Sequence, residues 1–115
     1  PVGTDLALRE RGVARNQPLQ LVFEGSRPGS RTEPFSLLRC TPATVHATSL
    51  KAAEDGDGWI LRLVETRGRS QSARVEGPGG YQLIETVLRP FEIQSWKWNP
   101  GAAPARVDLL EDPLA

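Results

Sequence analysis

Hydrophobic and polar residues alternate over short stretches of this 115-residue chain, and turn-forming residues separate the stretches. The clearest pair of stretches is Thr44 to Ala52 and Trp59 to Thr66, with Asp55-Gly56-Asp57-Gly58 between them. Asp-Gly pairs favour tight hairpin turns because glycine adopts positive φ without a steric penalty. The pattern therefore predicts two antiparallel strands joined by an acidic turn.

The second of these strands carries apolar residues on both faces. Side chains alternate along a strand, so Trp59, Leu61 and Leu63 fall on one face. Ile60 and Val64 fall on the other face. Apolar residues on both faces are typical of a strand that is covered on both sides. We therefore expect this strand in the interior of a sheet.

Further short strands are predicted on both sides of the hairpin. They are Leu6 to Arg9, Pro18 to Glu24, Ser72 to Glu76, Tyr81 to Leu88 and Phe91 to Trp98, with a loop at Gly25 to Pro34 and a short apolar run at Phe35 to Arg39. No convincing amphipathic helix of about ten or more residues is visible. The pattern predicts an all-β protein, an antiparallel β-sandwich of roughly seven to eight short strands with little or no helix.

The length of the chain fits one domain. We expect a single β-sandwich domain over residues 1–98. Residues 99–115 then form a Pro/Ala linker and a C-terminal tail that could add a strand. The chain begins with Pro1 and has no methionine, so we expect it to be a piece of a longer protein.

Charge and composition argue against some classes of function. The 14 basic and 14 acidic side chains give a net charge of zero, which argues against a nucleic-acid binder and against a ligand of anionic membranes. No apolar run approaches the roughly 20 residues that span a bilayer. Cys40 is the single cysteine, so no internal disulfide forms, and a reducing compartment such as the cytoplasm is expected.

No residue is predicted to be catalytic or to bind a metal or cofactor. His46 is the only histidine, and a lone histidine on a strand is more often structural than catalytic. Nothing basic near Cys40 in sequence would activate its thiol. Glu54, Asp55 and Asp57 could suggest calcium, but a calcium site needs about six to eight oxygen ligands, so a solvated turn is favoured.

Two further sets of residues have a functional and a structural interpretation. Glu65, Glu85 and Glu92 lie in predicted strands, and paired carboxylates serve glycoside hydrolases, although glutamates are also common on solvated strand faces. Trp59, Trp96 and Trp98 could contact carbohydrate, as in sugar-binding modules. Core packing or a domain interface is the favoured interpretation of the tryptophans.

Two segments resemble known sequence signatures. Ser49 to Gly68 resembles a signature near the end of glycoside hydrolase family 38 α-mannosidases, and Leu88 to Ile93 resembles a second one in the same C-terminal β-sandwich. The resemblance covers roughly residues 35–98. The matching residues, called signature residues below, are Lys51, Glu54, Asp55, Gly56, Gly58, Arg62, Glu65, Pro90, Phe91 and Glu92.

The resemblance implies that the chain is a non-catalytic domain of a retaining α-mannosidase. Such a parent hydrolyses terminal α-mannosides, and its zinc ion and catalytic carboxylates lie in an upstream α/β domain. This chain would support that domain, contribute to subunit contacts or to the rim of the mannoside cleft, and belong to a homo-oligomer. The alternative is an independent carbohydrate-binding or protein-interaction module.

The resemblance also gives structural roles and leaves one departure. Arg62 and Glu65 are expected to pair across strands or with the rest of the enzyme, because an unpaired charge on a covered face is costly. The stretch from Arg74 to Leu88 is shorter than in the family. A sequence motif that family members normally have in that interval is found here at Asp108 to Leu114.

Overall fold

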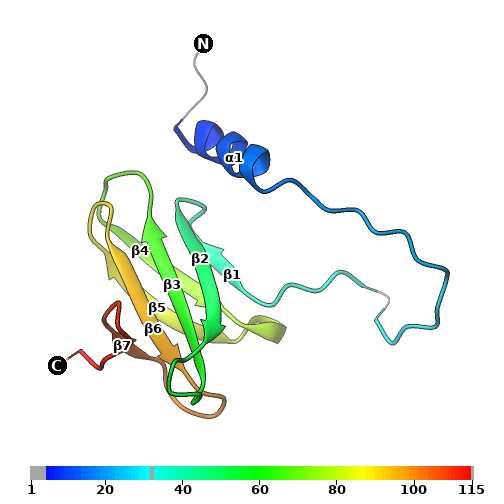
Figure 1. Cartoon of the computed structure of the whole chain (residues 1–115). Coiled ribbons are helices and arrows are strands. Elements are labelled where there is room, and N and C mark those ends of the chain that lie inside the picture. The colour runs from blue at the N-terminus through cyan, green and yellow to red at the C-terminus, as the bar shows by residue number, and fades with distance from the viewer. Residues whose placement is uncertain (1–4, 32, 115) are drawn as a thin grey trace. The chain divides into compact units, whose positions relative to one another are not determined.

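A computed structural model of the chain describes residues 5–31 and 33–114 (Figure 1). The chain divides into two units, Pro1–Ser36 and Leu37–Ala115. The second unit contains both β-sheets.

The first unit contains a helix where the sequence predicted a strand. Helix α1 (Asp5–Asn16) includes Leu6 to Arg9, so that strand prediction was wrong. The helix is rich in Leu, Ala, Arg and Glu, which have high helix propensity. Arg15 lies in the last turn, where a positive charge is favoured by the helix dipole. Leu8 and Val13 are exposed. The helix sequence lacks the apolar stripe by which an amphipathic helix is recognised, so the helix was not predicted.

The predicted strand at Pro18 to Glu24 was also wrong. This segment pairs with no strand in the described part of the chain. Leu19 and Phe23 are 101% and 89% exposed. A strand forms only where a neighbouring strand satisfies its backbone N–H and C=O groups, so β propensity alone did not decide this segment. The expected loop at residues 25–34 is irregular, with Thr32 outside the described residues.

The second unit consists of two antiparallel sheets. The first sheet has the order β1 (Arg39–Thr41), β4 (Gln71–Glu76), β5 (Gln82–Leu88). The second has the order β2 (Val45–Ala52), β3 (Trp59–Glu65), β6 (Ile93–Trp98), β7 (Ala105–Val107). A short 3-10 helix, Pro78–Gly80, lies between β4 and β5. These sheets confirm the predicted all-β sandwich.

The predicted hairpin and its central strand are confirmed. In the β2–β3 pair Ala52 lies opposite Trp59, and β3 lies between β2 and β6. The main core lies between the sheets and is formed by Val45, Leu61, Leu63, Ala73, Val75, Leu83, Ile84 and Leu88. On the outer face of β3, Ile60 packs with Ala53 and Val107. Both faces of β3 are therefore covered, as its sequence indicated.

The tail contributes to the second sheet. β7 pairs with β6, and Arg106 lies opposite Trp96. The chain then turns back, and Pro113 forms an isolated bridge with Val107. The predicted strands of this unit differ from the observed ones by one or two residues at one end, and Tyr81 and Phe91 lie in the turns before β5 and β6.

The two ends of the sandwich differ in their connections (Figure 1). The connections within a sheet are residues 53–58, 77–81 and 99–104, and we call their side the hairpin end. The connections between the sheets are residues 42–44, 66–70 and 89–92, and we call their side the crossing end. Because successive strands run in opposite directions, the two kinds of connection separate to opposite ends.

Candidate functional site

Glu65 is the buried carboxylate of the crossing end. Its side chain is 0% exposed. It accepts hydrogen bonds from the backbone N–H groups of Arg67 at 2.7 Å, Gly68 at 2.7 Å, Arg69 at 3.3 Å and Phe91 at 3.0 Å. Burial raises the pKa of Glu65, but the backbone donors outweigh it and hold the pKa below its ordinary value. This one carboxylate is therefore hydrogen-bonded to two of the three connections between the sheets, residues 66–70 and 89–92.

The third connection between the sheets, residues 42–44, is hydrogen-bonded to the same region around Glu65. Thr66 donates to the backbone carbonyl of Thr44 through both its N–H at 3.0 Å and its hydroxyl at 2.8 Å. The Thr44 hydroxyl donates to Gln71 Oε1 at 2.8 Å, and Gln71 Nε2 donates to Glu65 Oε1 at 3.1 Å. All three crossings are thus hydrogen-bonded around Glu65 and Thr66.

Glu92 organises the turn that follows Pro90. It accepts a hydrogen bond at 2.7 Å from the backbone N–H of Arg89, and Arg106 Nη2 lies 3.4 Å from its Oε1. Burial raises the pKa of Glu92, but these donors and the nearby arginines hold the pKa below its ordinary value. Phe91 adopts φ = 56°, and its ring packs where a Cβ on Gly68 would lie, 2.6 Å from Cζ.

Gln94 extends this network into the core. The residue is buried, and its Nε2 donates to the carbonyl of Val87 at 2.9 Å and to Glu92 Oε2 at 3.2 Å. Its Oε1 accepts from the Thr86 hydroxyl at 3.0 Å and from Trp96 Nε1 at 3.2 Å. Since Thr86 lies in β5 and Trp96 in β6, one amide links the two sheets.

At the hairpin end, Lys51 and Glu54 hold the tail. Lys51 Nζ lies 2.5 Å from Glu54 Oε1 and 2.7 Å from Glu111 Oε1. Glu111 Oε2 also accepts a hydrogen bond from the backbone N–H of Glu54 at 2.7 Å. Hydrogen bonds to Glu111 and Glu54 raise the pKa of Lys51, and the bond to Lys51 lowers the pKa of Glu111. Arg62 Nη2 donates to the carbonyl of Leu109 at 3.1 Å. Arg62 therefore pairs with the tail.

The acidic turn is held by internal contacts. Lys97 forms an ion pair with Asp55, which lowers the pKa of Asp55. Asp55 Oδ1 also accepts from the backbone N–H of Asp57 at 3.0 Å. Gly56 and Gly58 have φ = 77° and 91°, and a Cβ on Gly58 would overlap the side chain of Asn99. These positions therefore require glycine.

The three tryptophans lie on the face of the second sheet that is turned toward the core. Trp59 lies directly opposite Trp98, and Trp96 lies opposite Leu61. Trp96 and Trp98 pack against the core, whereas Trp59 is 44% exposed. The interpretation of Trp96 as a core residue is therefore the favoured one, and Trp98 and Trp59 extend toward the surface at the hairpin end.

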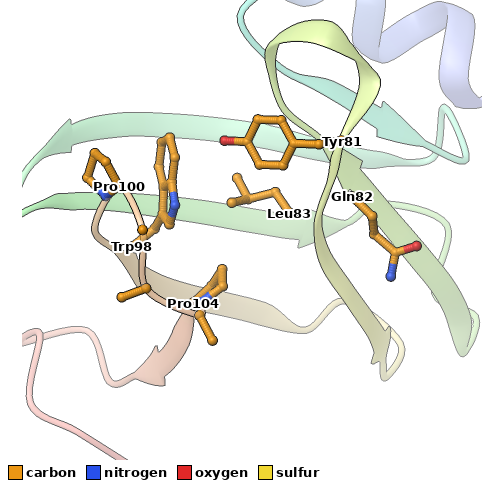
Figure 2. A pocket seen from close by; sticks show the side chains of 9 residues that line it. Tyr81, Gln82, Leu83, Trp98, Pro100 and Pro104 are labelled. Carbon is orange, nitrogen blue, oxygen red and sulfur yellow. The ribbon is translucent and has the colours of Figure 1, made fainter.

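An open pocket of about 550 Å³ lies beside Trp98 at the hairpin end. Figure 2 shows Tyr81 and Trp98 on opposite sides of it, with Leu83 between them and the hydroxyl of Tyr81 directed toward the indole. Pro100 and Pro104 lie on the Trp98 side. Tyr81 was predicted to lie in a strand and was not among the predicted site residues. A bulky aromatic beside the glycine-rich turn at residues 77–80 was the signal that could have found it.

In the described part of the chain, Cys40 and Glu85 lie in surroundings that do not favour catalysis. Burial raises the pKa of the Cys40 thiol, which opposes the formation of a reactive thiolate. Within residues 5–31 and 33–114, no group of three or more His, Cys, Asp or Glu residues is placed to hold a metal ion. Glu85 is exposed and pairs with Arg74 at 4.0 Å. None of the described helices has the length and apolar character needed to cross a bilayer.

Comparison with known proteins identifies a family. The family model described as "Glycosyl hydrolases family 38 C-terminal beta sandwich domain" matches residues 44–115. The match includes the hairpin, both carboxylate networks and the tail. No curated protein and no solved structure matches the chain.

Proposed function

Since the chain belongs to the family of glycosyl hydrolase family 38 C-terminal β-sandwich domains, we propose that it is the non-catalytic domain of a retaining α-mannosidase. The parent enzyme would hydrolyse terminal α-mannosides. The domain would act as a rigid support for the catalytic domain of the same protein.

One observation carries this proposal: the signature carboxylates are engaged in holding the fold. Glu65 accepts four backbone N–H groups at the crossing end. Glu92 is held by Arg89, Gln94 and Arg106. A glycosidase needs one carboxyl group that can donate a proton and another that faces the sugar. Carboxylates with lowered pKa values and internal donors suit a structural role instead.

The finer parts of the proposal concern the parent enzyme. Its zinc ion and its catalytic carboxylates would lie in the upstream catalytic domain, which is the main partner of this chain. The sandwich would contribute to subunit contacts in a homo-oligomer or to the rim of the mannoside cleft. We place the parent in the cytoplasm, since Cys40 is the single cysteine and no disulfide can form within the chain.

An activity assay tests the non-catalytic role. The purified 115-residue chain is incubated with an aryl α-mannoside and zinc, and release of the aryl group is followed by absorbance. We expect no hydrolysis above a boiled control. Hydrolysis that survives repurification of the chain would overturn the proposal.

The gene sequence upstream of Pro1 tests the parentage. We expect it to encode an α/β domain with histidine and aspartate residues arranged to bind zinc. A gene that encodes this sandwich without any hydrolase domain would contradict the proposal and favour an independent interaction module.

A further inference from the structure

We propose that the pocket at the hairpin end binds one pyranose ring of a mannose-containing glycan, between Tyr81 and Trp98. The choice of mannose rests on the proposed function, whereas the site itself rests on the geometry of the pocket. Its volume of about 550 Å³ lies in the range of small-ligand sites. It is open to solvent on the hairpin end, so a ring at the end of a longer glycan can enter it.

The walls have the chemistry that a sugar ring requires. The face of an aromatic ring carries partial negative charge, which attracts the weakly positive C–H groups on the apolar face of a pyranose. Trp98 supplies such a ring on one side of the pocket, Tyr81 directs its hydroxyl toward it from the other side, and Leu83 lies between them (Figure 2). No charged side chain lines the pocket among the described residues, which favours a neutral ligand over an anionic one.

Polar groups are available for the hydroxyls of the sugar. Neither the Tyr81 hydroxyl nor the Trp98 Nε1 group makes a hydrogen bond to another described residue. The loop of residues 100–104 brings its backbone to the same pocket. A neutral hexose needs such donors and acceptors around an apolar platform, because it has an apolar face and polar edges.

Both aromatic rings are positioned by the fold. A Cβ on Gly77 would lie 2.6 Å from the ring of Tyr81, so this glycine lets the ring pack closely against the turn. The backbone N–H of Gly77 also donates to the carbonyl of Tyr81 at 2.9 Å. Trp98 is held by its pairing with Trp59 and by the core. Pre-positioned rings reduce the entropy that binding must overcome.

The test is an NMR titration of the 115-residue chain with methyl α-mannopyranoside. We expect saturable shifts of the Trp98 indole N–H and of the amides of the 100–104 loop, with the Trp96 indole unchanged. Tyr81→Ala should weaken binding at least about tenfold. Ala102→Glu, which obstructs the exposed pocket loop without changing a core residue, should do the same. Phe91→Leu, an exposed aromatic at the crossing end, should bind as the unaltered chain does.

Three results would overturn the inference. The first is the absence of shifts at sugar concentrations of about 50 mM, well above the millimolar affinity of a weak site. The second is equal binding of methyl α-glucopyranoside, which would remove the assignment to mannosides. The third is binding of a proline-rich peptide with the same shifts and without sugar binding.

The outcomes also separate this inference from the proposed function. If a hydrolase domain is encoded upstream of Pro1 but the chain binds no sugar, the sugar site is refuted and the proposed parent enzyme stands. If the chain binds the sugar but no hydrolase domain is encoded upstream, the sugar site stands and the proposed parent enzyme is refuted.

Discussion

Glu65 illustrates how a residue recognised by resemblance can acquire a physical role from the structure. The sequence indicated that its charge needs a partner, and we expected a cross-strand pair or a contact with another domain. Its partners are instead four backbone N–H groups in two turns and the neutral side-chain amide of Gln71. Backbone donors carry no residue identity, so no pattern of charged side chains could reveal them.

Replacing Glu65 with glutamine should destabilise the sandwich. The amide nitrogen of glutamine cannot accept the hydrogen bonds that the second carboxylate oxygen receives, and the remaining bonds lose their charge assistance. We expect the free energy of unfolding to fall by about 2 kcal/mol. Urea unfolding followed by tryptophan fluorescence measures it. The control Glu85→Gln changes an exposed glutamate and should cost less than about 0.5 kcal/mol. Equal losses in both variants would contradict the role of Glu65.

Stability should also depend on pH through Glu65. Its pKa in the folded protein lies below the ordinary value of 4.5, so the unfolded chain takes up a proton first as the pH falls. The stabilisation is present above pH 4.5 and is lost as the pH falls through the lower folded value. We expect the unfolding free energy to decline more steeply below pH 4.5 in the unaltered chain than in Glu65→Gln. Parallel curves from acid titrations in urea would refute this.

At the scale of elements, the local pattern gave the right answer for the hairpin, in which a turn signal joins two strands that are neighbours in sequence. The β2–β3 hairpin has its turn residues and both strands within Val45–Glu65, so it was predictable. α1 was missed because Leu8 and Val13 are exposed and no apolar stripe exists. Pro18 to Glu24 has strand composition but no paired neighbour in the described chain, and pairing is decided by tertiary structure.

The tail shows the same limit for the candidate site. Lys51 and Glu54 were identified by resemblance, but their partner Glu111 lies 57 positions after Glu54. A sequence does not show which distant segments meet, so the tail could be an added strand or a free end. In the structure the tail covers Ile60, because Val107 of β7 packs against it.

Shortening Val107 should weaken the attachment of β7. Val107→Ala removes two buried methyl groups that pack on Ile60 and Ala53, at a cost of about 2 kcal/mol. Leu110→Ala, in the same tail, changes a side chain that is 79% exposed and should be nearly neutral. Thermal unfolding of both variants gives the comparison. A larger loss in Leu110→Ala than in Val107→Ala would show that the tail is held by other contacts.

At the scale of the whole molecule, the two units differ in how they protect their backbone. The second unit has two hydrogen-bonded sheets around a shared core. In the first unit, residues 18–31 form no helix or strand, and the apolar side chains from Leu19 to Phe23 are exposed. Proteases cleave exposed backbone faster than backbone that is paired in a sheet.

Limited trypsin digestion should therefore cut first after Arg31, which lies in the irregular segment. The expected product is the fragment from residue 32 to residue 115, identified by mass spectrometry. Arg62, Arg74 and Arg106 lie within strands and should be cleaved later. Early cleavage at any of these three sites would contradict the assignment of a stable core to Leu37–Ala115.

The hydrogen-bonded crossing end has a consequence for the evolution of this family. An insertion in residues 66–70 or 89–92 would pull backbone N–H groups away from Glu65 and leave a buried charge unsatisfied. The turns of the hairpin end join strands of one sheet, and there Glu111 accepts a single backbone N–H, that of Glu54. Lineages should therefore accumulate insertions and deletions at the hairpin end while the crossing end keeps its length.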